Sequence, residues 1–382
     1  WHRDPVPMYE RLRTKDPVHY SELVRGWVVS CYEDVDAVLR DSDRFGNDPR
    51  RGANADALEA IEVVPSMLNL NPPDHTRMRS LVMQAFTPKA INGWRDRIDA
   101  VIDEIFQDIG DSSRFDLMER IAVPLPVVVI AEILGIPPAD RGRFKVWSDD
   151  IARTLEPTMT RSEMYRARVS RVALDEYFSP IIEERRRAPK DDLISSLAQA
   201  EEAGDTLTHG ELIATLVLLL VAGNETTTNL IGNGTLALLT QPDQLRWLRE
   251  HPEQVDVAVE EMLRHDSPVQ INGRRALVDV EVGGRRIKAG EQLILLQGSA
   301  NHDPEHWRDQ ADAFDLSRGD KGHLSFGRGI HYCLGAPLAR LEAQLLFPRM
   351  LERWPSLRIA ATPQFKDNVV LRGMRTFEVA VD

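Results

Sequence analysis

Apolar residues recur with helical spacing over most of this chain, and polar residues fill the positions between them. This period of about 3.6 residues predicts amphipathic helices. Pro137, Pro157 and Pro189 separate several of these helices, and an Asn-Pro-Pro-Asp sequence at residues 71–74 predicts the start of another. The remaining predicted helices cover residues 33–40, 88–109, 124–135, 138–154, 161–187, 190–203, 208–240, 252–265 and 336–346.

Strand-like patterns are confined to three short parts of the chain. Residues 18–31 alternate around Arg25-Gly26 and predict a hairpin, whereas short apolar segments broken by glycines lie within residues 276–296 and 369–381. Residues 45–70 predict a long loop. No change of composition indicates a linker. We therefore expect one domain over residues 1–382, mainly α, with a small β region.

Composition limits the partners and the compartment. The formal net charge of −13 disfavours broad binding to nucleic acid or to an anionic membrane. Cys31 and Cys333 are the two cysteines, which excludes a disulfide framework and suits a reducing cytoplasm. The apolar run from Leu212 to Gly223 is too short to span a bilayer. We expect a soluble cytoplasmic protein.

The most informative stretch is Phe326-Gly-Arg-Gly-Ile-His-Tyr-Cys-Leu-Gly335. Its three glycines permit tight turns and close approach to a flat ligand. Because a helix is predicted directly after it, Cys333 lies at a helix N-terminus, where the dipole and free N–H groups favour a thiolate. Such a thiolate is a nucleophile or a metal ligand. The alternative is an inert buried cysteine beside a glycine-rich turn.

The spacing Phe-Gly-x-Gly-x-His-x-Cys-x-Gly resembles the haem-binding loop of the cytochrome P450 family. The resemblance covers nearly the whole chain. It implies the cytochrome P450 fold, with a long central helix over a haem. It also implies haem b (iron protoporphyrin IX) as cofactor and Cys333 as the iron ligand, with Phe326 packed on the cysteine side of the haem.

Within the predicted central helix, Ala222-Gly-Asn-Glu-Thr-Thr-Thr228 follows an apolar stretch, and these residue types are unfavourable inside a buried helix. The Thr226 hydroxyl can bond the Ala222 carbonyl and loosen the helix. A kinked core helix is the alternative. The segment resembles the family's oxygen-activation motif. The resemblance implies that Thr226 hydrogen-bonds dioxygen and that Glu225 is the acid of the proton relay.

Glu261 and Arg264 lie three residues apart on a predicted helix, where an exposed pair contributes only about 0.2–0.5 kcal/mol. The pair resembles the family's Glu-x-x-Arg, which implies a buried structural pair rather than a catalytic one. Ala313 stands where an Arg or His often completes this network in the family, so the group that completes it here is left open.

The haem propionates of the implied cofactor need cationic or hydrogen-bonding partners. The resemblance nominates His75, Arg79, Arg274 and His331 for this role. A solvated surface charge is the commoner fate of a single Arg or His. The role of His323 in the same loop is left open.

The resemblance implies a haem-thiolate monooxygenase that hydroxylates or epoxidises a hydrophobic small molecule with one atom of O2, as in secondary metabolism. The chain carries no flavin, nicotinamide or iron–sulfur motif, so electrons are expected from a ferredoxin or flavodoxin with its reductase. A basic patch of Arg77, Lys89, Arg328 and Arg340 is predicted to bind that partner.

The substrate pocket is expected to be mostly apolar, which fits a terpenoid, a steroid, a fatty acid or a macrolide. Residues 60–70 and 155–170 are expected to contribute to it. The other predicted pocket residues are Leu219, Ala222, Gly223, Val269, Ile271 and Val370.

Three other functions remain in competition. A peroxygenase driven by hydrogen peroxide would not need Glu225 and Thr226. A non-catalytic haem-thiolate protein that binds a ligand would need only the cysteine and the propionate contacts. A hydrolase using Cys333 and His331 has an unpromising geometry, because two residues two apart in a glycine-rich loop have no evident third group to orient them.

Overall fold

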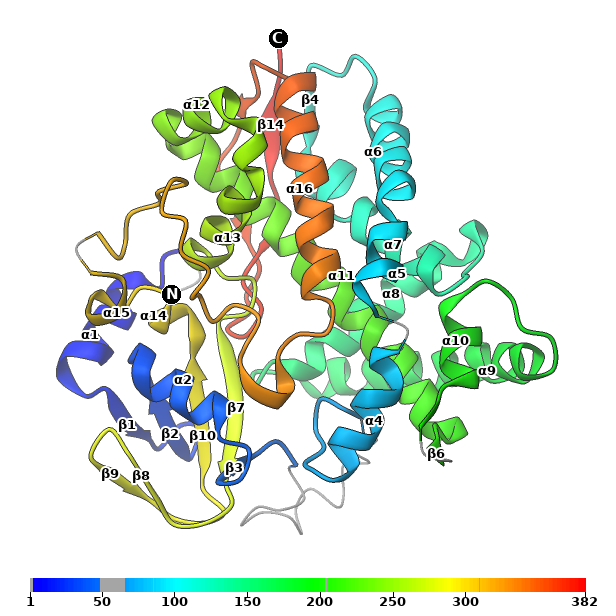
Figure 1. The fold of residues 1–382 in the computed structure, drawn as a ribbon. Coiled ribbons are helices and arrows are strands. Elements are labelled where there is room, and N and C mark those ends of the chain that lie inside the picture. Colours follow the sequence, from blue (N-terminus) through cyan, green and yellow to red (C-terminus); the bar gives the residue numbers. More distant parts are fainter. Residues whose placement is uncertain (1–2, 49–65, 85, 203–204, 309) are drawn as a thin grey trace.

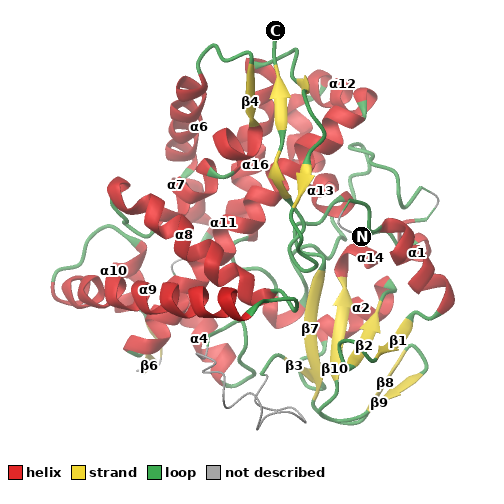
Figure 2. Cartoon of the chain, turned by 180° about the vertical axis from the view of Figure 1, so that it is seen from behind, coloured by secondary structure: helices red, strands yellow, loops and turns green. Residues whose placement is uncertain are grey.

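The structure is a computed structural model that describes residues 3–48, 66–84, 86–202, 205–308 and 310–382. Helices form most of it, and the strands gather in two places (Figures 1 and 2). The helices are α1 (Val6–Lys15), α2 (Tyr32–Arg40), α4 (Asp74–Met83), α5 (Pro88–Gly93), α6 (Arg95–Ile109), α7 (Pro124–Ile133), α8 (Arg141–Ala152), α9 (Arg161–Arg187), α10 (Leu193–Gln199), α11 (His209–Thr240), α12 (Pro242–Glu250), α13 (Val255–His265), α14 (Gln297–Ala300), α15 (Pro304–Trp307) and α16 (Ala336–Arg353).

The long helix α11 forms the centre of the core, as predicted from residues 208–240, and it packs against α7, α8, α13 and α16. A capping box fixes its start, because Thr208 and Glu211 each accept a hydrogen bond from the other's backbone N–H. Among the described residues, α11 is the one helix long and apolar enough to cross a membrane, and 67% of its most apolar window is buried inside the protein.

The larger sheet has five strands in the order β1-β2-β10-β7-β3. The predicted hairpin is confirmed as β1 and β2, and β10 adds parallel to β2 while β7 runs antiparallel to β10. This sheet lies beside α1, α2 and α14 (Figure 2). Its strands are β1 (Val18–Ser21), β2 (Gly26–Val29), β3 (Phe45–Gly46), β7 (Ile271–Ala276) and β10 (Gln292–Leu296).

The other strands are short and pair in four groups. The order β11-β14-β4 forms one small sheet near the C-terminus, and β5–β6, β8–β9 and β12–β13 are two-stranded (Figure 1). The bounds are β4 (Arg114–Asp116), β5 (Glu201–Glu202), β6 (Asp205–Thr206), β8 (Val280–Val282), β9 (Arg285–Ile287), β11 (Arg358–Ile359), β12 (Gln364–Phe365), β13 (Met374–Thr376) and β14 (Glu378–Ala380).

Four predicted elements differ from the structure. The helix predicted over residues 88–109 is two helices, α5 and α6, which meet at Trp94. The one over 190–203 ends at Gln199, and the one over 336–346 continues to Arg353. The strand expected from Ala276 to Val282 is divided, because β7 ends at Ala276 and pairs with β10, whereas β8 begins at Val280 and pairs with β9.

The predicted strand at residues 369–371 is replaced by a single bridge from Leu371 to Val269. The physical reason is a buried carboxylate. Glu156 is 3% exposed and accepts the backbone N–H groups of residues 369, 370 and 371 at 2.8, 3.2 and 3.1 Å. Three consecutive N–H groups that converge on one acceptor cannot continue a strand ladder.

Candidate active site

The loop that carries Cys333 is fixed by its backbone. The Cys333 N–H donates to the Phe326 carbonyl at 2.9 Å, which closes the loop on itself. Gly329 has a φ of +67°, and a Cβ there would lie 2.5 Å from the Leu39 carbonyl oxygen on α2. Glycine is therefore required at this turn. The loop lies beside α2 and leads into α16, drawn in orange in Figure 1.

The environment of Cys333 favours a metal ligand over a free nucleophile. Burial raises the pKa of its thiol, although the backbone N–H groups of Gly335 and Ala336 and the Arg79 guanidinium act in the opposite direction. The N–H groups at the helix N-terminus thus act in the predicted direction, and burial has the larger effect. A nucleophilic cysteine needs a lowered pKa, whereas a bound metal cation displaces the thiol proton itself.

Four basic residues gather near this loop from three elements. His75 and Arg79 come from α4, Arg274 from β7, and His331 from the cysteine loop. The rings of His75 and His331 lie 4.3 Å apart between centroids. The Arg79 guanidinium donates to the Tyr332 carbonyl at 2.5 Å. The structure therefore brings together all four residues that the resemblance nominated.

This basic cluster (His75, Arg79, Arg274 and His331) has no carboxylate partner among the described residues. Arg274 is 4% exposed and donates only to neutral groups, the Asn272 amide oxygen at 2.8 Å and the Gly273 carbonyl at 2.7 Å. Burial, with the nearby guanidinium charges, lowers the pKa of His75 to about 4 and that of His331 to about 3.

A buried guanidinium without a carboxylate is costly, so the cluster is suited to a ligand that brings its own carboxylates. Both ring nitrogens of His75 are also buried without a hydrogen-bond partner. A haem supplies two propionates and an iron that needs one protein sulfur. In the part of the chain that the structure describes, no three His, Cys, Asp or Glu side chains gather to hold a bare ion. The residues present thus fit a haem.

One face of the otherwise buried helix α11 is accessible. Leu218, Ala222 and Thr226 follow each other at intervals of four residues, and they and Gly223 are exposed or partly exposed. The Thr226 hydroxyl donates to the Ala222 carbonyl at 2.7 Å, as predicted. These residues define an open stripe on α11. Leu219, another predicted pocket residue, is 8% exposed and packs in the core beside this stripe.

The carboxylate of Glu225 lies outside this open stripe. Glu225 is 7% exposed, and its Oε1 accepts a hydrogen bond at 2.5 Å from the ammonium of Lys366. Sequence analysis did not identify Lys366 as a site residue. The two residues are 141 positions apart, and no local pattern links them.

The remaining predicted pocket residues lie on two adjoining segments. Val269, Ile271 and Val370 are all partly exposed. The Gln270 N–H donates to the Val370 carbonyl at 2.9 Å, which places the two segments side by side. Glu156, from the predicted 155–170 region, holds the segment of Val370 in place through its hydrogen bonds to the backbone of residues 369–371. Residues 60–65 of the other predicted pocket segment lie outside the described residues.

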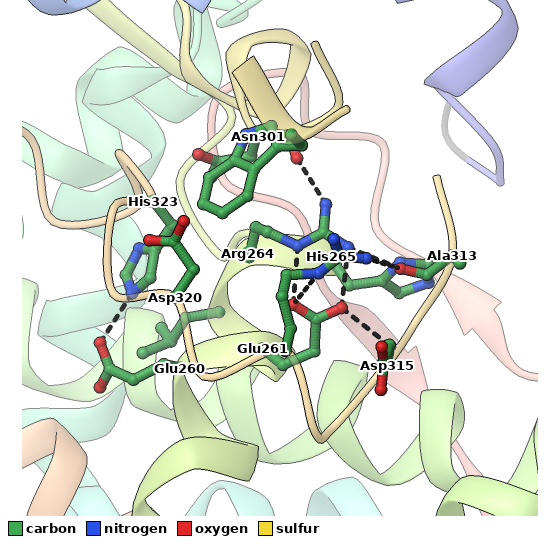
Figure 3. A network of polar contacts seen from close by, with 12 residues as sticks. Glu260, Glu261, Arg264, His265, Asn301, Ala313, Asp315, Asp320 and His323 are labelled. Carbon is green, nitrogen blue, oxygen red and sulfur yellow. Dashed lines mark hydrogen bonds and ion pairs between the residues drawn. The ribbon is translucent and has the colours of Figure 1, made fainter. Parts of the chain in front are cut away.

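The Glu261–Arg264 pair is buried, as the resemblance implied. Arg264 is 0% exposed and donates to both Glu261 oxygens at 2.7 and 2.8 Å. It also donates to the backbone carbonyls of Asn301, Ala311 and Ala313 (Figure 3). Position 313 thus contributes its carbonyl instead of a cationic side chain.

A second cation completes this network. The guanidinium of Arg318 lies 3.3 Å from Glu261 Oε2, and the Asp315 N–H donates to Glu261 Oε1 at 2.9 Å. The carboxylate is therefore balanced by two arginines and a backbone N–H. The group that completes the Glu261–Arg264 network, which the sequence left open, is therefore Arg318 together with the backbone.

His323 belongs to a separate buried cluster beside the cysteine loop. Its Nε2 lies 3.0 Å from Glu260 Oε2 (Figure 3), and Arg340 donates to both Glu260 oxygens at 2.5 and 2.8 Å. The Arg340 guanidinium also lies over the Phe326 ring, 4.5 Å from its centroid. This cluster braces Phe326, which is partly exposed, against α13 and α16.

The predicted basic patch is largely engaged inside the protein. Arg340 binds Glu260, Arg77 pairs with Glu211, and the Arg328 guanidinium lies 3.4 Å from Asp36 Oδ1. Lys89 is exposed. Since paired cations contribute little net attraction, the patch has less free charge than the sequence predicted.

Comparisons with known proteins agree with this geometry. A family model described as Cytochrome P450 matches residues 25–368. The polyketide biosynthesis cytochrome P450 PksS of Bacillus subtilis (strain 168) is 38% identical over 398 residues, which covers 100% of this chain and 96% of that protein.

Solved structures are similar over the whole chain. P450BioI, in complex with acyl carrier protein ligated to hexadec-9Z-enoic acid, has a TM-score of 0.93 at 35% identity and covers 100% of this chain and 99% of its own. CYP109E1 from Bacillus megaterium in complex with testosterone has a TM-score of 0.89 at 36% identity, with 99% of each chain covered.

Proposed function

The chain belongs to the cytochrome P450 family, and from this premise we propose which residues perform each part of its reaction. The protein is a monooxygenase with a haem cofactor, and it uses O2, a small hydrophobic substrate and electrons from redox partners. The observation that carries the assignment of residues is the basic cluster beside Cys333, in which His75 and Arg274 are buried and which has no carboxylate of its own among the described residues.

In this proposal Cys333 is the ligand of the iron in haem b, and Arg79 and Arg274 pair with its propionates. His75 and His331, whose ring centroids lie 4.3 Å apart, donate hydrogen bonds from their ring N–H groups to the same carboxylates. When bound, a haem with a thiolate ligand activates O2 so that one oxygen atom enters the substrate and the other leaves as water.

The protein's own groups position the substrate and supply protons. The open stripe on α11 and the segments at Val269, Ile271 and Val370 enclose a mostly apolar substrate for hydroxylation or epoxidation. Thr226 presents its hydroxyl on that stripe, and Glu225, one residue before it, is the acid that renews the proton.

We assign the electron donor to a ferredoxin or flavodoxin with its reductase, and its docking to the exposed cation Lys89. The polyketide relative supports a role in secondary metabolism. We further propose that the chain acts as a single domain in the cytoplasm. The low cysteine count is consistent with that compartment.

The test replaces the two arginines of the basic cluster. Arg274→Gln and Arg79→Gln should each lower the haem content of the purified protein and speed haem transfer to apomyoglobin, because a charge-assisted pair is lost. Arg275→Gln is the matched control, since Arg275 is adjacent and donates only to the Gly290 carbonyl at 2.7 Å. Equal haem retention in all three variants would refute the propionate assignment.

A further inference from the structure

The acid assigned to the proton relay is tied to a lysine from a distant segment. Lys366 follows β12, and its backbone N–H donates to the Gly373 carbonyl at 3.0 Å, so its main chain is fixed. Its side chain is 23% exposed and its ammonium lies 2.5 Å from Glu225 Oε1. A nearly buried carboxylate with a single lysine partner is stable only while that pair persists.

The lysine of this ion pair reaches solvent, whereas the acid does not. The Lys366 side chain is 23% exposed, and Glu225 is 7% exposed. Asp149 on the neighbouring helix α8 forms its ion pair with Lys145 instead. Water can therefore exchange protons with the Lys366 ammonium directly.

The relay hydroxyl and its acid are not bonded to each other in this arrangement. Thr226 donates to the Ala222 carbonyl and Glu225 accepts from Lys366. Consecutive residues on a helix point about 100° apart, so Glu225 faces the β12–β13 side while Thr226 faces the open stripe. The hydroxyl and its acid therefore lie on different faces of α11.

We propose that Lys366 is a positioning residue that holds the Glu225 carboxylate and passes to it protons that enter from solvent at its own partly exposed ammonium. In each transfer an N–H bond of the ammonium breaks and an O–H bond forms on Glu225. The neutral amine then takes a proton from water. The net change is one proton moved inward, with no electron transferred. This inference rests on the relay role proposed for Glu225.

The test measures the coupling, which is the fraction of electron pairs from the redox partner that form product instead of hydrogen peroxide. Lys366→Met should lower that fraction roughly tenfold, as far as Glu225→Gln does, because a general acid that cannot be recharged is lost. Lys366→Arg keeps the cation that holds Glu225, but a guanidinium does not give up a proton, so this variant should retain the ion pair and still leave the fraction low. Lys190→Met is the control, since Lys190 pairs with Glu184 on the surface at 2.9 Å.

A second readout does not depend on turnover. Urea unfolding of Lys366→Met, Glu225→Gln and the double variant forms a double-mutant cycle, and a direct ion pair requires that the two single losses are not additive. Wild-type coupling in Lys366→Met alongside poor coupling in Glu225→Gln would overturn the Lys366 inference alone. Wild-type coupling in both variants would instead overturn the relay role of Glu225.

Discussion

Glu342 on α16 provides a stability prediction that follows directly from the structure. Its side chain is 2% exposed, and its Oε2 is buried without a hydrogen-bond partner among the described residues. Burial raises the pKa of this carboxyl group from 4.5 to about 8. The folded protein therefore keeps the proton over a pH range in which the unfolded chain has already lost it.

The sign and size of the effect follow from proton linkage. Between pH 4.5 and pH 8 the folded state binds one proton more than the unfolded state, so the free energy of unfolding falls as pH rises through this window. The slope is about 1.4 kcal/mol per pH unit, which gives a loss of at most ~5 kcal/mol by pH 8. Glu342→Gln keeps the shape of the side chain and removes its ionisation.

Urea unfolding, followed by tryptophan fluorescence from pH 5 to pH 8.5, tests this reasoning. The free energy of unfolding of Glu342→Gln should exceed that of the wild type by a small amount at pH 5, and this difference should grow steadily towards pH 8. Glu352→Gln is the control, because Glu352 is exposed on the same helix and should follow wild type at every pH. A constant difference between Glu342→Gln and wild type across the range would refute a neutral buried acid.

Three further variants test the substrate side and the docking surface. Thr226→Ala should leave substrate binding intact but raise hydrogen peroxide per electron consumed. An unchanged product yield per electron consumed would refute the relay role of Thr226. Glu156→Gln should destabilise the protein by ~1.5–3 kcal/mol in thermal unfolding, since three backbone N–H groups lose a charged acceptor; a shift of the melting temperature within error would count against this clamp. Lys89→Glu should raise the KM for ferredoxin most at low ionic strength, and steady-state rates independent of salt would exclude that docking site.

Local signals in the sequence explain the parts of the fold that were predicted well. The helix over 161–187 matches α9 at both ends. Thr160 and Glu163 form a capping box that fixes its start. The start of α11 follows the same rule. The hairpin at 18–31 was found because its alternation is local. Resemblance to the family located the basic cluster and the Glu261–Arg264 pair, which no local pattern specifies.

The features that were missed depend on backbone groups or on contacts between distant segments. The carbonyl of Ala313 replaces a side chain, and any residue type could supply it. The strand expected at 369–371 is displaced by Glu156, whose sequence neighbourhood gives no sign of that contact. Leu219 and Leu218 differ by one step on a helix that is apolar on nearly every side, so periodicity could not decide which of them is the more exposed.

The central claim is that the thiolate of Cys333 is the protein ligand of a haem, and the absorption spectrum of the reduced protein with carbon monoxide tests it most directly. We predict the strongly red-shifted Soret band of a thiolate-ligated haem, and its loss in Cys333→His. A reduced carbon monoxide spectrum of the wild-type protein with the band of an imidazole-ligated haem, or with no haem band at all, would contradict the account.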